Sequence, residues 1–196
     1  MNLTITVITD ENLRELDKLA LEILNLQENL IFEKSEYSDG VNSGFLISKF
    51  DLPELTKIVT EKKGVLFCAL GIEGEVLGYC LTSAITEFQD LYHGQSAVGR
   101  VELTIDSSLA LKPRYLYQIA VRSDLRRSGV GIELLLAVKD KYPEGILTDI
   151  LVSPINNEAS LNFFRKQDFK MVGHLFLDSY RDFGQLVSEV FLWSTS

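Results

Sequence analysis

A glycine-rich stretch between a strand-like and a helix-like segment is the strongest chemical feature of this sequence. Residues 126–131 read Arg-Arg-Ser-Gly-Val-Gly, after the β-rich run YLYQIAV and before the apolar run GIELLLAVKDKY. Glycines have no Cβ atom, so main-chain N–H groups can converge on an anion there. The N-terminal end of the following helix adds partial positive charge. The pattern therefore predicts a phosphate-binding loop.

Other interpretations of the same glycines fit less well. A P-loop needs four residues between its glycine and Gly-Lys-Ser/Thr, and the sequence contains no such pattern. A dinucleotide-binding fingerprint needs a third glycine, but Leu134 occupies that position. The fingerprint also has an acidic residue about 20 positions after its glycines. Asp149 lies at about that distance, but it falls inside a predicted strand. An ordinary strand-to-helix turn stays open as the alternative without a ligand.

The charge pattern supports an anionic ligand in this part of the chain. The 196 residues carry a net charge of −9, yet residues 112–127 hold five basic side chains and one acidic one. An acidic chain repels nucleic acid and anionic membranes outside such a local basic patch, so neither is an expected partner. The N-terminus lacks the basic and apolar regions of a signal peptide, and no apolar run approaches about 18 residues. We expect a cytoplasmic protein.

A second motif follows the glycine loop by one predicted strand. In the segment NNEASLNFFRKQDF, Asn157 and Phe169 stand where motif B of the GCN5-related N-acetyltransferase (GNAT) superfamily has asparagine and phenylalanine. Ser160, Phe164 and Asp168 replace its usual alanine, tyrosine and glycine. The glycine loop likewise resembles motif A, Q/R-x-x-G-x-G/A. Two motifs in the family's order make the resemblance to GNAT proteins fairly specific.

The resemblance implies one α/β (α+β) GNAT domain over residues 1–196. Its expected sheet is mixed and mostly antiparallel, with about seven strands and about four flanking helices, splayed between strands 4 and 5. Periodicity predicts the same order along the chain: strands at 3–8, 64–71, 75–84, 115–121, 146–152, 170–177 and 186–193, and helices at 11–26, 51–63, 131–142 and 157–168. Residues 29–50 look like a long loop. Residues 85–113 could be a lid, an extra strand or a loop.

The resemblance also implies a function, that of an acyl-CoA-dependent N-acyltransferase. Acetyl-CoA is the expected co-substrate, and a small molecule or peptide with a primary amine is the expected acceptor. The alternative is a non-catalytic acyl-CoA binding or sensing domain, and a homodimer is left open. The residues carried over to the coenzyme A site are Ile119, Ala120, Val121, Arg126, Arg127, Ser128, Gly129, Val130, Gly131, Asn157 and Phe164.

Catalytic residues are less clear than the coenzyme A loop. Relatives use a motif B tyrosine to protonate the leaving thiolate, but Phe164 has no hydroxyl group. Tyr117 and Tyr180 are candidate donors and Glu102 is a candidate base, and further candidates are Tyr115, Glu87, Asp90, His93, Asp106 and His174. Two cysteines without clustered histidines predict no metal site. A hairpin turn at 71–74 would place Cys68 opposite Leu77 and the two cysteines on opposite faces of the sheet.

Overall fold

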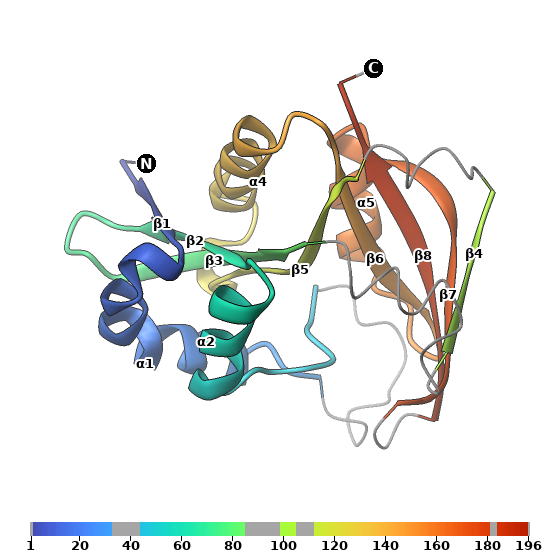
Figure 1. Cartoon of the computed structure of the whole chain (residues 1–196), viewed down its shortest axis with the longest axis horizontal. Helices are drawn as coiled ribbons and strands as arrows, with labels where there is room; N and C mark the ends of the chain where they lie inside the picture. The colour runs from blue at the N-terminus through green and yellow to red at the C-terminus, as the bar shows by residue number, and fades with distance from the viewer. Residues whose placement is uncertain (1, 33–43, 85–98, 105–111, 181–183, 196) are drawn as a thin grey trace. The chain divides into compact units, whose positions relative to one another are not determined.

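The computed structural model of the protein describes residues 2–32, 44–84, 99–104, 112–180 and 184–195 (Figure 1). It confirms a mixed α/β fold with one sheet of eight strands in the order β1-β2-β3-β5-β6-β8-β7-β4. The extra strand is β4, which forms inside the segment that sequence patterns left unassigned. The elements are β1 (Thr4–Ile8), η1 (Asp10–Asn12), α1 (Arg14–Glu28), α2 (Leu52–Glu61), β2 (Val65–Leu70), β3 (Val76–Ser83), β4 (Gly99–Leu103), β5 (Arg114–Val121), η4 (Ser123–Leu125), α4 (Val130–Lys141), β6 (Ile146–Ser153), α5 (Glu158–Lys166), β7 (Lys170–Tyr180) and β8 (Gly184–Trp193).

The chain forms two compact units, and each is described by itself. The first contains residues 1–31, 46–84 and 116–142. In it, α1 and α2 cover one face of β1–β3 and α4 covers the other (Figure 1). Asp51 caps the N-terminus of α2. Its carboxylate accepts the N–H of Glu54, while the Glu54 side chain accepts the N–H of Asp51. None of the described helices is both long enough and apolar enough to cross a membrane.

The β2–β3 hairpin corrects one predicted contact. Its turn closes between Gly71 and Glu75, and a bulge follows Ala69, so Cys68 lies opposite Tyr79 and not Leu77. Cys80 pairs with Phe67 instead. Because neighbouring residues of a strand point to opposite faces, the two thiols lie on opposite sides of the sheet, as predicted. Both are buried and neither forms a disulfide.

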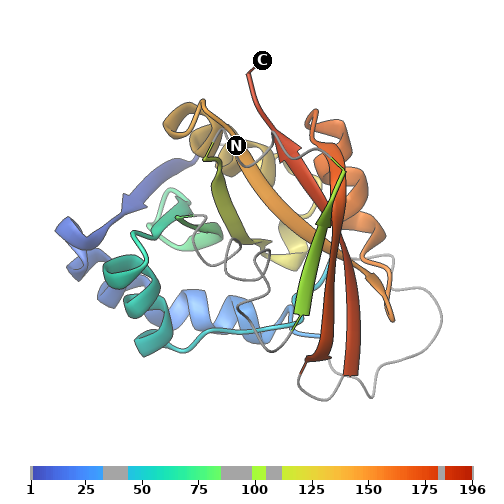
Figure 2. The same ribbon diagram turned by 45° about the vertical axis from the view of Figure 1, so that its right-hand side comes forward.

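The second unit contains residues 32–45, 85–115 and 143–196. Its centre is the β7–β8 hairpin, with β6 paired to β8 and β4 paired to β7, all antiparallel (Figure 2). Buried aliphatic side chains from these strands form the core of one face. Only the first two residues of β5 belong to this unit. Arg114 pairs with Ile146 and Tyr115 with Leu147, in parallel. In the described residues, the recorded pairing of β5 with β6 ends there.

Candidate functional site

The loop between β5 and α4 presents several main-chain N–H groups. In the part of the chain that the structure describes, no acceptor is recorded for the N–H groups of Arg127, Gly129, Val130 and Gly131. The Gly129 carbonyl accepts N–H groups from the first turn of α4, which starts the helix directly after it. Four such donors at a helix N-terminus suit a bound diphosphate.

Backbone geometry explains why glycine stands at position 129. Its φ of 98° lies in the left-handed region, which other L-residues adopt only at a cost. A Cβ atom there would meet nothing within 4 Å, so the requirement comes from the dihedral angle and not from crowding. Arg127 also has a positive φ, of 65°. Two left-handed residues two positions apart turn the chain sharply before α4.

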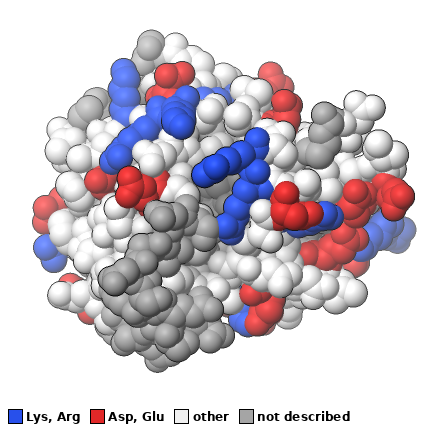
Figure 3. Space-filling model, turned by 180° about the vertical axis from the view of Figure 1, so that it is seen from behind, with Lys and Arg blue, Asp and Glu red and all other residues white. Residues whose placement is uncertain are grey.

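Charged side chains lie beside this loop. Arg126 and Arg127 are exposed. Arg122 donates two hydrogen bonds to Asp124, of 3.1 and 2.7 Å. The hydrogen bond from Arg122 lowers the pKa of Asp124 below its usual range. On the face drawn in Figure 3, basic side chains form separate small groups with acidic ones beside them.

The end of β5 carries the residues expected to face the acyl thioester. Ala120 is buried, while Ile119 and Val121 are half-buried. A Cβ atom on Gly78 of β3 would lie 2.6 Å from the carbonyl oxygen of Ala120, so only glycine allows this close approach. The N–H of Arg122 donates to the Leu77 carbonyl at 3.0 Å and extends the contact between these strands. The backbone of β5 is thus firmly held on its β3 side.

The two motif B residues both have structural partners. Asn157 caps α5 by accepting the N–H of Ser160 at 3.3 Å, and its amide donates to the Phe45 carbonyl at 3.1 Å. Phe164 is 1% exposed and packs edge-on against Phe169, with ring centroids 5.0 Å apart. The Phe164 ring therefore belongs to the core of the second unit. Its side chain has no proton to donate.

The predicted catalytic side chains are distributed over both units. Tyr117 lies in the first unit, where its ring meets Phe50 edge-on with centroids 6.0 Å apart. Glu102 lies in the second unit on β4, exposed and paired with Arg100 at 3.1 Å. Tyr180 is the last residue of β7. His174, which pairs with Glu102, lies six residues earlier, or roughly 20 Å away along the strand. Glu102 and Tyr180 are therefore not brought together. The candidates Glu87, Asp90, His93 and Asp106 lie outside the described residues.

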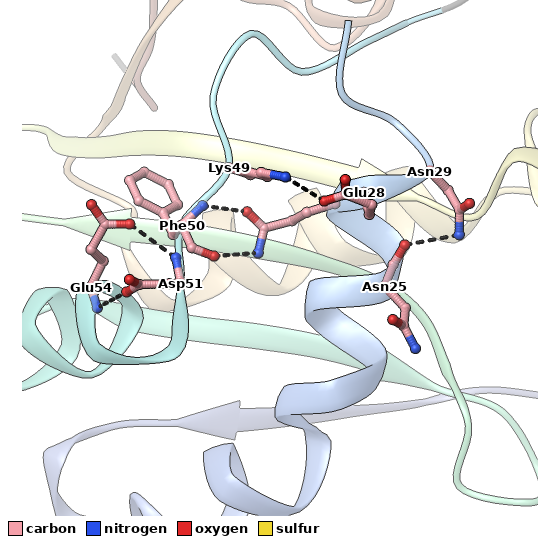
Figure 4. A network of polar contacts seen from close by, with 8 residues as sticks. Asn25, Glu28, Asn29, Lys49, Phe50, Asp51 and Glu54 are labelled. Carbon is pink, nitrogen blue, oxygen red and sulfur yellow. Dashed lines mark hydrogen bonds and ion pairs between the residues drawn. The ribbon is translucent and has the colours of Figure 1, made fainter.

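Sequence patterns gave no role to a buried glutamine that anchors the segment before α2, where Figure 4 labels Lys49, Phe50 and Asp51. Gln27 is fully buried at the end of α1. Its amide nitrogen donates to the Phe50 carbonyl at 3.2 Å, and its amide oxygen accepts the Phe50 N–H at 2.7 Å. Beside it, Lys49 and Glu28 form an exposed ion pair at 2.6 Å. The Gln27 side-chain amide thus forms hydrogen bonds with both the main-chain N–H and the main-chain carbonyl of Phe50.

A second buried glutamine ties the same segment to β5. Gln118 donates to the Ser48 carbonyl at 2.8 Å and accepts the hydroxyl of the fully buried Tyr79 at 2.7 Å. Its neighbour Tyr117 contacts Phe50, so consecutive residues of β5 both meet residues 48–50. Polar side chains inside an otherwise apolar strand are the signal that sequence reasoning could have used here.

An acidic residue lies in the middle of β6. Asp149 accepts a short hydrogen bond from the Tyr115 hydroxyl and another from the Ser188 hydroxyl. Burial raises the pKa of Asp149 above its usual range, and these two hydrogen bonds only partly offset the increase. In the sequence this residue interrupts the apolar run ILTDILV, which is the signal that marks it.

This fold, with a glycine-containing loop leading into the helix after β5, defines a class of acetyltransferase-like α/β proteins. A profile of the "Acetyltransferase (GNAT) family" matches residues 32–169, and the chain belongs to this family. The match spans both sequence motifs, so the predicted relationship is confirmed. A search of curated protein sequences returns no match.

Solved structures of N-acetyltransferases share the fold at low sequence identity. The ribosomal-protein-S18-alanine N-acetyltransferase from Escherichia coli has a TM-score of 0.60 at 11% identity, covering 100% of this chain and 96% of its own. An N-acetyltransferase from Staphylococcus aureus Mu50 has a TM-score of 0.57 at 17% identity, with both chains fully covered. Arabidopsis thaliana NAA60, solved with a bisubstrate analogue, has a TM-score of 0.54 at 13% identity, also with full coverage.

Proposed function

We propose that this GNAT acetyltransferase transfers an acetyl group from acetyl-CoA directly to a primary amine. The observation that carries the proposal is the loop at residues 126–131. Four main-chain N–H groups with no recorded acceptor in the described residues meet the N-terminus of α4 there, next to two exposed arginines. A diphosphate carries the negative charge and the acceptor oxygens that such donors need.

The proposal assigns each part of the site a task. The N–H groups of residues 127–131 and the side chains of Arg126 and Arg127 bind the diphosphate of coenzyme A. The backbone at residues 119–121 binds the pantetheine arm and polarises the thioester carbonyl, which stabilises the negative charge developing on its oxygen. An uncharged amine then attacks the carbonyl carbon, the carbon–sulfur bond breaks, and a base takes one proton from the amine.

The acceptor and cellular context belong to the same proposal. We expect a small molecule or a peptide with a primary amine, and a cytoplasmic location, with neither nucleic acid nor membrane as a partner. The net charge of −9 supports attraction of a cationic amine and repulsion of polyanions. A homodimer stays open, and sedimentation at several protein concentrations tests it.

Release of free CoA thiol from acetyl-CoA tests the proposal, with spermidine, kanamycin, a lysine-containing peptide and a free N-terminal peptide as acceptors. The double variant Arg126→Ala, Gly129→Asp should abolish both turnover and the thermal stabilisation by acetyl-CoA. Gly74→Asp is the matched control, because Gly74 also has a positive φ and free space around its Cβ position but lies in the β2–β3 turn. Unchanged coenzyme A binding in the double variant would refute the loop assignment.

A non-catalytic acyl-CoA binding domain is the second candidate. Phe164 favours it, because a buried phenylalanine stands where relatives place a proton-donating tyrosine. Stabilisation by acetyl-CoA without thiol release across the whole amine panel would support this alternative. Turnover of any one amine would exclude it.

A further inference from the structure

The eight-stranded sheet ends in β1 on one side and in β4 on the other, and these two edges differ in chemistry. β4 carries Arg100 and Glu102, whose side chains are 57% and 61% exposed. Exposed charges on an edge strand oppose the addition of another strand. β1 reads Thr-Ile-Thr-Val-Ile and has no charge, proline or glycine. It pairs with β2 (Figure 1), and no strand among the described residues pairs with its second edge.

Alternation along the strands shows which main-chain groups of β1 face away from β2. In an antiparallel pair, the N–H and C=O of one residue point to the same side, and successive residues point to opposite sides. Gly71 donates its N–H to the Glu75 carbonyl across the β2–β3 turn, so odd-numbered residues of β2 point to β3. Ile5 and Val7 lie opposite odd-numbered residues of β2. Their main-chain groups therefore point to the second edge of β1.

Asn12 marks one end of this edge. Its side-chain amide donates to the Val7 carbonyl at 3.0 Å, and its amide oxygen accepts the Thr9 N–H at 2.7 Å. The bond to Val7 agrees with the direction given by the alternation, because Asn12 belongs to the segment after β1 and not to β2. The same alternation, continued by two residues before Ile5, directs the groups of Leu3 to this side. We call residues 3–7 the open edge, and its centre is Ile5.

We propose that the open edge is a dimerisation site, at which the β1 strands of two copies of this chain pair antiparallel across a two-fold axis at Ile5. Each Ile5 then exchanges both main-chain hydrogen bonds with Ile5 of the other copy. Each Val7 N–H donates to the Leu3 carbonyl of the other copy. These four hydrogen bonds leave the Val7 carbonyl with Asn12. The dimer does not depend on the proposed acetyl transfer.

The side chains of the open edge are complementary to themselves in this register. Thr4 of one copy lies opposite Thr6 of the other, and Leu3 lies opposite Val7. The two Ile5 side chains lie opposite each other. Threonine pairs and pairs of apolar side chains are both favourable when they face each other across antiparallel strands. One face of the joined strands is thus apolar, and the other carries hydroxyl groups.

The charges after β1 favour the antiparallel direction. Asp10 and Glu11 follow the C-terminal end of the strand. Two parallel copies would bring these four carboxylates together, whereas two antiparallel copies hold them at opposite ends of the joined strands. The chain carries a net charge of −9, so an arrangement that separates acidic groups lowers the repulsion between copies.

Sedimentation equilibrium of the full chain at several protein concentrations tests the dimer, and Ile5→Pro is the decisive variant. Proline cannot donate to a partner strand, but the N–H that it removes makes no hydrogen bond to β2, and proline is tolerated at such edge positions. We expect the dissociation constant of the dimer to rise by about 100-fold or more. Ile5→Val is the matched control, because it keeps the N–H and the β-branched shape, and it should stay within about threefold of the wild type.

Two charge variants test the register without proline. Thr4→Lys with Thr6→Lys places like charges opposite each other across the axis and should abolish the dimer. Thr4→Lys with Thr6→Glu alters the same two positions but places opposite charges there, so this variant should still form the dimer. A register centred on Thr4 or on Thr6 would instead place two like charges opposite each other in both variants.

Three outcomes overturn the proposal. The first is a wild-type chain that stays monomeric up to about 0.5 mM, which would leave the open edge to a different partner. The second is an Ile5→Pro variant with native circular dichroism that dimerises as the wild type does, which would place the interface elsewhere. The third is the same oligomeric state in both charge variants.

Discussion

Replacing Gln27 with methionine should destabilise the protein strongly although it removes no apolar contact. Gln27 is fully buried, and its amide satisfies both the N–H and the carbonyl of Phe50. Methionine is similar in size but can neither accept from the N–H nor donate to the carbonyl. A buried polar group left without a partner costs about 1–3 kcal/mol. The substitution leaves two such groups without a partner, and burial of the apolar methionine side chain offsets part of their cost. We therefore expect the free energy of unfolding to fall by about 2–4 kcal/mol.

Urea unfolding followed by circular dichroism measures this change, with the slope m compared to establish that both proteins unfold alike. Lys49→Ala is the matched control, because it breaks the exposed pair with Glu28 beside Phe50 and should cost less than about 0.5 kcal/mol. Hydrogen exchange at the Phe50 amide should accelerate in Gln27→Met and stay nearly unchanged in the control. A loss below about 1 kcal/mol with unchanged exchange would show that Phe50 finds other partners, and would refute this reasoning.

Three further predictions concern backbone geometry and thiol chemistry. Gly129→Ala should cost about 1–2 kcal/mol, because alanine resists a φ of 98°, and isothermal titration should show weaker acetyl-CoA binding. Gly78→Ala should lower the urea midpoint by an amount equivalent to about 1–3 kcal/mol, because the new methyl group would lie 2.6 Å from the Ala120 carbonyl oxygen. Burial raises the pKa of Cys68 to about 12 and that of Cys80 further, so neither thiol should react with Ellman's reagent at pH 8 until guanidinium unfolds the chain.

Local patterns in the sequence were sufficient for the elements and for the family. The apolar periodicities predict the four α-helices of the described residues, and the two motifs identify the GNAT relationship that the family profile confirms. The loop at residues 126–131 was predictable because its chemistry is local, resting on glycines, a strand before it and a helix after it. The register of the β2–β3 hairpin was not, because a longer turn and a bulge moved Cys68 opposite Tyr79.

The sequence by itself predicted the loop proposed to bind coenzyme A, and it determined the mixed α/β class and the absence of a hydroxyl group at Phe164. Each of these depends on residue type and spacing over short distances. Only the tertiary structure decided which distant polar groups meet. Gln27 and Phe50 are 23 residues apart, and Tyr115 and Asp149 are 34 apart. Such partners are chosen by the pairing of strands and the packing of helices, and no local pattern encodes that choice. The contact between Tyr115 and Asp149 therefore emerged from strand pairing, whereas the proposed acetyl-CoA loop was evident in six consecutive residues.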